Sequence, residues 1–103
     1  HPYPTSARLQ VGLALLALGR AHEAVAPLER ALADRLASSQ PPAALGEARF
    51  GLARALWDVG ERTRAGTLAW QALDDGRALE PRPPRALQGV REWIEHNDVP
   101  RPP

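Results

Sequence analysis

A helix–glycine–helix pattern that occurs twice is the feature that most limits what this chain can fold into. In each copy an apolar helical run ends at a glycine, Gly19 in the first and Gly60 in the second, and a new helical run starts at once. We call the offset that places Gly19 on Gly60 the repeat shift. Under this shift, small residues recur where two helices must approach, and a residue that tolerates positive φ recurs at the turn. Identical pairs include Ala7/Ala48, Arg8/Arg49, Ala14/Ala55, Leu15/Leu56, Gly19/Gly60, Ala24/Ala65, Ala31/Ala72 and Leu32/Leu73.

Helical periodicity and the proline positions predict the order of the elements. We expect an all-α fold whose helical domain covers 5–97, with a first hairpin over about 5–37, a second over about 42–78 and a capping helix over about 84–96. The second helix of each hairpin is expected to bury an inner stripe. These stripes are Ala24, Leu28, Ala31 and Leu32 in the first hairpin and Ala65, Leu68, Ala69, Ala72 and Leu73 in the second.

Both ends of the chain are rich in proline, which fixes φ and lacks a backbone donor. Residues 1–4 are therefore expected to be extended, and the tail, 98–103, to be disordered. Because the chain begins with His1 and not with Met, we expect it to be a piece of a longer protein.

Composition argues against catalysis, cofactors and metals. Cysteine is absent, which excludes disulfides, thiolate catalysis and zinc–thiolate sites. No two of the three histidines have the helical spacing of a metal site, and no glycine-rich phosphate loop is present. No apolar run approaches the ~20 residues of a membrane span. We expect a cytoplasmic protein that is not an enzyme, with no cofactor, metal site or membrane partner.

The repeated residues resemble the tetratricopeptide repeat, a family of stacked helical hairpins. The family pattern has a large and then a small residue in the first helix, glycine at the turn, and alanine early in the second helix. The matching residues here are Val11-Gly12, Leu52-Ala53, Gly19, Gly60, Ala24, Ala65, Leu28 and Ala31. The chain departs from the pattern at Arg8 and Arg49, which replace a tryptophan, and its period exceeds the usual ~34 residues. The resemblance implies a short α-solenoid that acts as a protein–protein interaction scaffold.

In this family the first helices of the repeats line the ligand groove. Carried over to this chain, the groove residues are Leu9, Leu13, Leu16, Phe50, Arg54, Trp57 and Asp58. The resemblance implies a partner peptide or domain lying across this wall. Phe50 and Trp57 would be its apolar anchors, and Arg54 would meet a carboxylate or a backbone carbonyl.

Residue spacing leaves two interpretations of the aromatic stripe open. Phe50, Arg54 and Trp57 share one face of the third helix, and another stripe of that helix already supplies the contact with the fourth. The aromatic face is therefore predicted to be free for a partner. In the alternative interpretation, these side chains pack between repeats or beneath a neighbour. Trp70 and Trp93 are predicted to be packing residues.

The first helix carries apolar residues on two faces, which is more than a single packing partner requires. An earlier repeat would explain the surplus. We predict that the exposed helix supports a homo-oligomer through Leu9, Leu13 or Leu16.

Two alternative functions stay open. Arg- and Ala-rich repeats such as residues 47–57 are similar to those of large bacterial signalling proteins, where in myxobacteria they often follow a serine/threonine kinase domain. That similarity implies a regulatory accessory region of such an enzyme. Arg49, Arg54, Arg62 and Arg64 could also form a basic patch for nucleic acid, but the net charge of +1 and the interleaved acids make this the weaker alternative.

Overall fold

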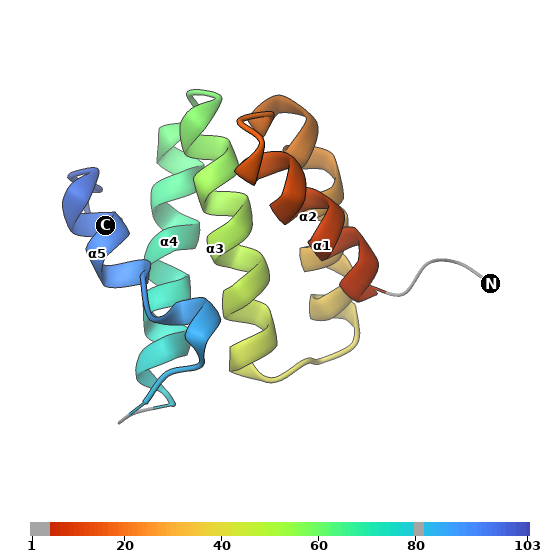
Figure 1. Ribbon diagram of the computed structural model, residues 1–103. Coiled ribbons are helices and arrows are strands. Elements are labelled where there is room, and N and C mark those ends of the chain that lie inside the picture. The colour runs from red at the N-terminus through yellow and green to blue at the C-terminus, as the bar shows by residue number, and fades with distance from the viewer. Residues whose placement is uncertain (1–4, 80–81) are drawn as a thin grey trace.

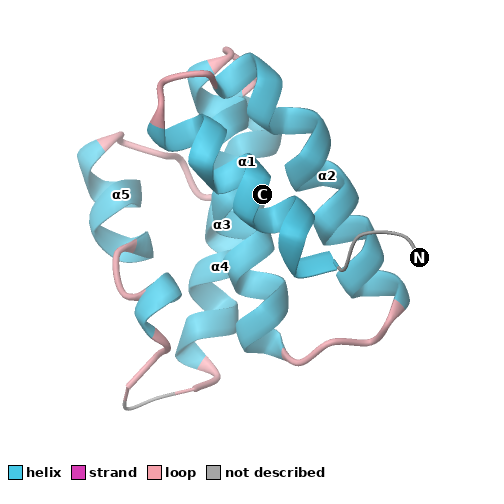
Figure 2. Cartoon of the chain, turned by 45° about the vertical axis from the view of Figure 1, so that its right-hand side comes forward, coloured by secondary structure: helices cyan, strands magenta, loops and turns pink. Residues whose placement is uncertain are grey.

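The computed structural model describes residues 5–79 and 82–103, and this part of the chain is all-helical (Figure 1). Its elements are α1 (Thr5–Ala17), α2 (Ala21–Ala37), α3 (Pro42–Asp58), α4 (Arg62–Arg77), the 3₁₀ turn η1 (Arg85–Leu87) and α5 (Val90–His96). No strand occurs in the described ranges (Figure 2). The all-α prediction is therefore confirmed. The extended segment expected for 1–4 lies outside the described residues.

The four long helices form two antiparallel hairpins, α1–α2 and α3–α4, that pack side by side. Helix α3 contacts α2 on one side and α4 on the other, and it also touches α1. In Figure 1, α1 lies at one end of this stack and α5 at the other. Because α3 has neighbours on most sides, it contributes more buried residues than any other described helix.

The two repeated glycines lie at the turns between the helices of each hairpin, as predicted. Gly19 has φ of 76° and Gly60 has φ of 94°, which an L side chain rarely adopts. The same backbone hydrogen bond forms at both turns: Arg20 N donates to Leu15 O, and Glu61 N donates to Leu56 O. Each N–O distance is 2.9 Å. These are the closing bonds of the same helix-ending motif, so both hairpins turn in the same way.

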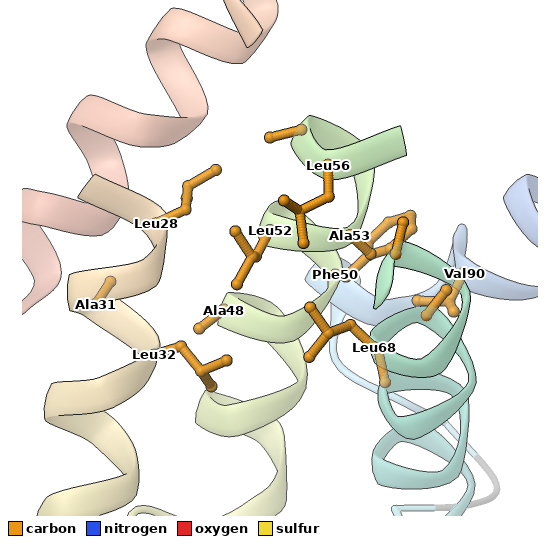
Figure 3. Packing of buried hydrophobic residues seen from close by; sticks show 14 of the residues in the cluster. Leu28, Ala31, Leu32, Ala48, Phe50, Leu52, Ala53, Leu56, Leu68 and Val90 are labelled. Atoms are coloured by element: carbon orange, nitrogen blue, oxygen red, sulfur yellow. The ribbon is translucent and has the colours of Figure 1, made fainter. Parts of the chain in front are cut away.

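Leucines and alanines fill the core, and the predicted inner stripes are largely confirmed (Figure 3). On α2, all four predicted residues are buried. On α4, all but Leu73 are buried, and Leu73 packs against the core while partly exposed. Alanine is suited to these positions because its short side chain lets two helices approach closely.

In each hairpin an ion pair joins the first helix to a residue near the end of the second. Arg8 pairs with Asp34 in the first, and Arg49 pairs with Asp75 in the second, where the N–O distance is 2.8 Å. The repeat shift relates the two pairs to each other. Arg8 and Asp34 lie 26 residues apart, so their contact shows only when the helices are brought together.

The C-terminal segment differs from the prediction. The expected helix over 84–96 is divided into η1 and a shorter α5, with Gln88 and Gly89 between them. The tail was expected to be disordered, but Val99 is only 5% exposed and packs against α4. Gly66 is the reason: a Cβ at this position would lie 3.3 Å from Val99, so the absence of a side chain leaves room for the tail.

We expect alanine at either turn glycine to destabilise the fold by about 1–2 kcal/mol, because positive φ strains a residue with a Cβ. No atom lies within 4 Å of the added Cβ at Gly19 or Gly60, so the backbone alone sets this cost. Gly76→Ala is the control, because Gly76 lies inside α4 and an added Cβ would make ordinary contacts with Leu87 and Pro83. Urea unfolding measures all three. If Gly60→Ala and Gly76→Ala had the same free energy of unfolding, the positive φ of Gly60 would not strain an alanine at this position.

The ion pair between Arg49 and Asp75 should contribute to stability, because these side chains are only 19% and 14% exposed. In a double-mutant cycle with alanine at both positions, we expect a coupling free energy of about 1–2 kcal/mol. The control cycle uses Arg20 and Glu23, which are 53% and 55% exposed and should show no measurable coupling. Similar coupling in the two cycles would show that burial does not strengthen the repeated pair.

Candidate interaction site

Helix α3 presents different faces to different neighbours. Ala48 and Leu52 lie toward Leu32 and Leu28 of α2 (Figure 3). The stripe of Phe50, Arg54 and Trp57 belongs to another face, and it meets the C-terminal segment. We call this meeting place the α3–α5 seam and define it by Phe50, Arg54, Trp57 and Trp93.

Trp93 of α5 covers the aromatic stripe. Its ring meets Phe50 edge to face, with 5.8 Å between centroids and 84° between planes, and meets Trp57 at 5.6 Å and 75°. Such edge-to-face pairs stabilise beyond the area that they bury. The prediction that the Phe50 stripe is free for a partner is therefore wrong for Phe50, which is only 8% exposed. Trp57 is partly buried, and Trp93 is a packing residue as predicted.

Arg54 lies in the seam with unmet hydrogen-bonding capacity. Its guanidinium stacks over the Phe50 ring, 4.6 Å from the centroid. Its Nε is buried and donates to no acceptor in the described part of the chain. Burial lowers the pKa of Arg54 from its ordinary value, and the charge of Asp58, one turn along, opposes that shift. Arginine nevertheless stays protonated, so the seam holds a fixed cation.

A second guanidinium borders the seam. Arg62, at the start of α4, lies over the Trp57 ring at 4.5 Å from the centroid. Sequence reasoning did not connect Arg62 with Trp57, because the glycine turn between them removes helical periodicity. Asp58 is exposed beside them. The seam thus combines aromatic faces, two cations and one carboxylate, which suits recognition of a polar group next to an apolar one.

The site residues predicted on the first hairpin pack in or against the core of their own chain. Leu9 is 1% exposed, and Leu13 and Leu16 are partly buried. Leu13 lies so close to α3 that a Cβ added at Gly51 would be 3.0 Å from it. The prediction of self-association through these leucines is therefore wrong for Leu9, because its own chain already covers it.

The repeat explains where both sets of predicted residues lie. The repeat shift relates Leu9, Leu13 and Leu16 to Phe50, Arg54 and Trp57. In both hairpins part of this stripe meets a later element of the chain: Leu13 lies against Gly51 of α3, and Phe50 and Trp57 lie against Trp93 of α5. The difference is that α5 is much shorter than α3, so it covers the second stripe incompletely.

Each of the four arginines proposed as a basic patch contacts another side chain of the protein. Arg49 pairs with Asp75, Arg64 pairs with Glu29, and Arg54 and Arg62 stack on aromatic rings. Within residues 5–79 and 82–103, no group of three His, Asp or Glu side chains is placed to hold a metal ion. No described helix is both long and apolar enough to cross a bilayer.

Comparisons with known proteins give no relative of this chain: no family model, no curated protein and no solved structure matches it.

Trp93→Ala should destabilise the protein by about 2–4 kcal/mol, because it removes two edge-to-face contacts and uncovers Phe50. Leu36→Ala is the control, because Leu36 is a large apolar residue that is 50% exposed and should change stability little. Thermal and urea unfolding followed by circular dichroism measure both. If Trp93→Ala unfolds like the unmodified protein, α5 does not stabilise the seam.

Proposed function

We propose that this chain is a protein–protein interaction scaffold of the tetratricopeptide-repeat kind, without catalytic activity, that binds a partner peptide at the α3–α5 seam. The observation that carries the proposal is the Arg54 guanidinium, which is held against Phe50 while the residue as a whole remains partly exposed and its Nε has no acceptor within the described residues. A peptide carboxylate or backbone carbonyl would bind the exposed side of this guanidinium.

Two properties of the seam favour peptide binding. Stacking on Phe50 restricts the Arg54 side chain before a ligand arrives, which lowers the conformational entropy lost on binding. Trp57 is partly buried, so one part of the ring is anchored and another remains accessible. Arginine and tryptophan are the residue types that most often dominate binding energy at interfaces.

The charges at the seam limit the kinds of peptide that can bind there. Arg54 and Arg62 flank the aromatic rings, and Asp58 lies beside them. We infer a peptide with an acidic side chain or a free C-terminal carboxylate next to an apolar residue, because these groups complement two cations and an aromatic surface. A regulatory role within a larger bacterial signalling enzyme stays a prediction from resemblance, because it concerns residues outside this chain.

The test selects peptides from a displayed random library on the immobilised protein and measures them by calorimetry. Arg54→Gln should weaken the selected peptides about tenfold or more, because it removes the charge that meets the carboxylate. The matched control is Arg30→Gln, an exposed arginine on α2, which should leave affinity unchanged. Peptides without acidic groups that bind both variants equally would contradict the proposal.

Trp57→Ala separates binding from folding. We expect it to lower peptide affinity by about 2 kcal/mol while costing less stability than the ~3–5 kcal/mol of a fully buried aromatic residue. Thermal unfolding and calorimetry on the same sample measure the two effects. If stability collapses and the folded fraction keeps its affinity, Trp57 belongs to the core alone.

A further inference from the structure

The outer side of α1 is an exposed apolar face. Val11 is 54% exposed and Leu18 is 69% exposed, and Ala14 between them is exposed as well. Leu18 directly follows α1, and its N donates to Ala14 O over a distance of 3.1 Å, as in a helix. Val11 and Leu18 are about two helical turns apart, so they share one side of the helix. That side is opposite to the one on which Leu9 meets the core.

The repeat shows that these positions suit burial against another helix. The repeat shift relates Val11 to Leu52 and Ala14 to Ala55, both fully buried in α3. Leu18 corresponds to Val59, which packs against the core while partly buried. In α3, Leu52 lies toward Leu28 of α2 (Figure 3), whereas the described residues leave Val11 and Leu18 exposed on α1.

We propose that a second copy of this chain covers this face, with the two α1 helices packed antiparallel across a two-fold axis. The argument is self-complementarity. The midpoint between Val11 and Leu18 falls beside Ala14, so an axis there places Val11 of each copy against Leu18 of the other. The small Ala14 then lies at the axis, where the helices approach most closely. A two-fold interface requires this kind of matching of one surface with itself.

Charge also favours a second copy over a charged partner. Arg8 is the only charged residue of α1, and Asp34 of the same chain pairs with it. Two α1 faces can therefore meet without repulsion between like charges, which an antiparallel homodimer must avoid. The contact is small, because a helix of 13 residues is about 20 Å long, so we expect weak association. This inference does not rest on the proposed peptide site.

Sedimentation equilibrium of the purified chain tests the proposal from about 10 μM to about 1 mM, the range expected for so small an interface. We expect a monomer–dimer equilibrium whose dissociation constant rises at least about tenfold in Val11→Arg and in Leu18→Arg. Leu36→Arg, which changes a similarly exposed leucine on α2, should leave it unchanged. Melting curves check that the variants remain folded. The proposal is wrong if the protein is monomeric over the whole concentration range, or if Val11→Arg leaves the dissociation constant of the dimer unchanged.

Disulfide trapping tests the geometry separately, since the chain has no cysteine of its own. Two Ala14→Cys side chains at the axis can approach the Cβ–Cβ distance of about 3.8 Å that a disulfide requires. We therefore expect rapid oxidation of Ala14→Cys to a covalent dimer. Gln71→Cys, on the exposed side of α4, should oxidise slowly. Equal rates for the two variants would overturn the antiparallel arrangement.

Discussion

The close approach of three helices around Leu28 is the contact on which the rest of the structure depends. Leu28 of α2 is fully buried, and glycines of both α1 and α3 face it. A Cβ added at Gly12 would lie 2.5 Å from Leu28, and one added at Gly51 would lie 3.4 Å from it. These short distances set how near the helices come, and therefore where α3 presents its remaining faces. Because protein interiors are close-packed, a side chain at Gly12 would have to displace α1 or Leu28.

Arginine provides most of the polar contacts between elements. The chain has 13 basic residues, and every one is arginine. Arg8 and Arg49 close the two hairpins, while Arg35 joins them by binding both Glu47 and the carbonyl of Ala44. Other guanidiniums stack on aromatic rings: Arg101 of the tail lies 4.4 Å from the centroid of Trp70. A planar guanidinium can stack on a ring while its N–H groups donate hydrogen bonds. The ammonium of lysine has no planar face that could stack in this way.

The C-terminal segment connects the fold to the proposed function. It covers the last hairpin as α3 covers the first, with Trp93 and Val99 as buried or partly buried contacts. Its covering helix is short, however, and Arg54 beneath it has a buried Nε with no acceptor among the described residues. The N-terminal end of the stack has no such cover within the described residues, and it exposes Val11 and Leu18 instead. The two ends of the stack thus differ: one has an arginine among aromatic rings, and the other has an exposed apolar face.

The sequence by itself determined the local features of this protein. Gly19 and Gly60 had to end helices because of their conformational freedom, and apolar periodicity identified the inner stripes of α2 and α4. Both signals act within a few residues of the chain, so no knowledge of the neighbours was needed. The all-α class followed from the same signals.

Only the tertiary structure decided which apolar faces remain available. Phe50 and Val11 both belong to stripes that periodicity identifies as apolar, but Phe50 is covered by Trp93 and Val11 is exposed. The sequence also did not show whether the tail would pack against the helices. Val99 packs because Gly66, far earlier in the chain, leaves room for it. Periodicity shows that a face is apolar but does not show what lies against it. That depends on contacts between residues far apart in the chain, which are settled only when the helices pack.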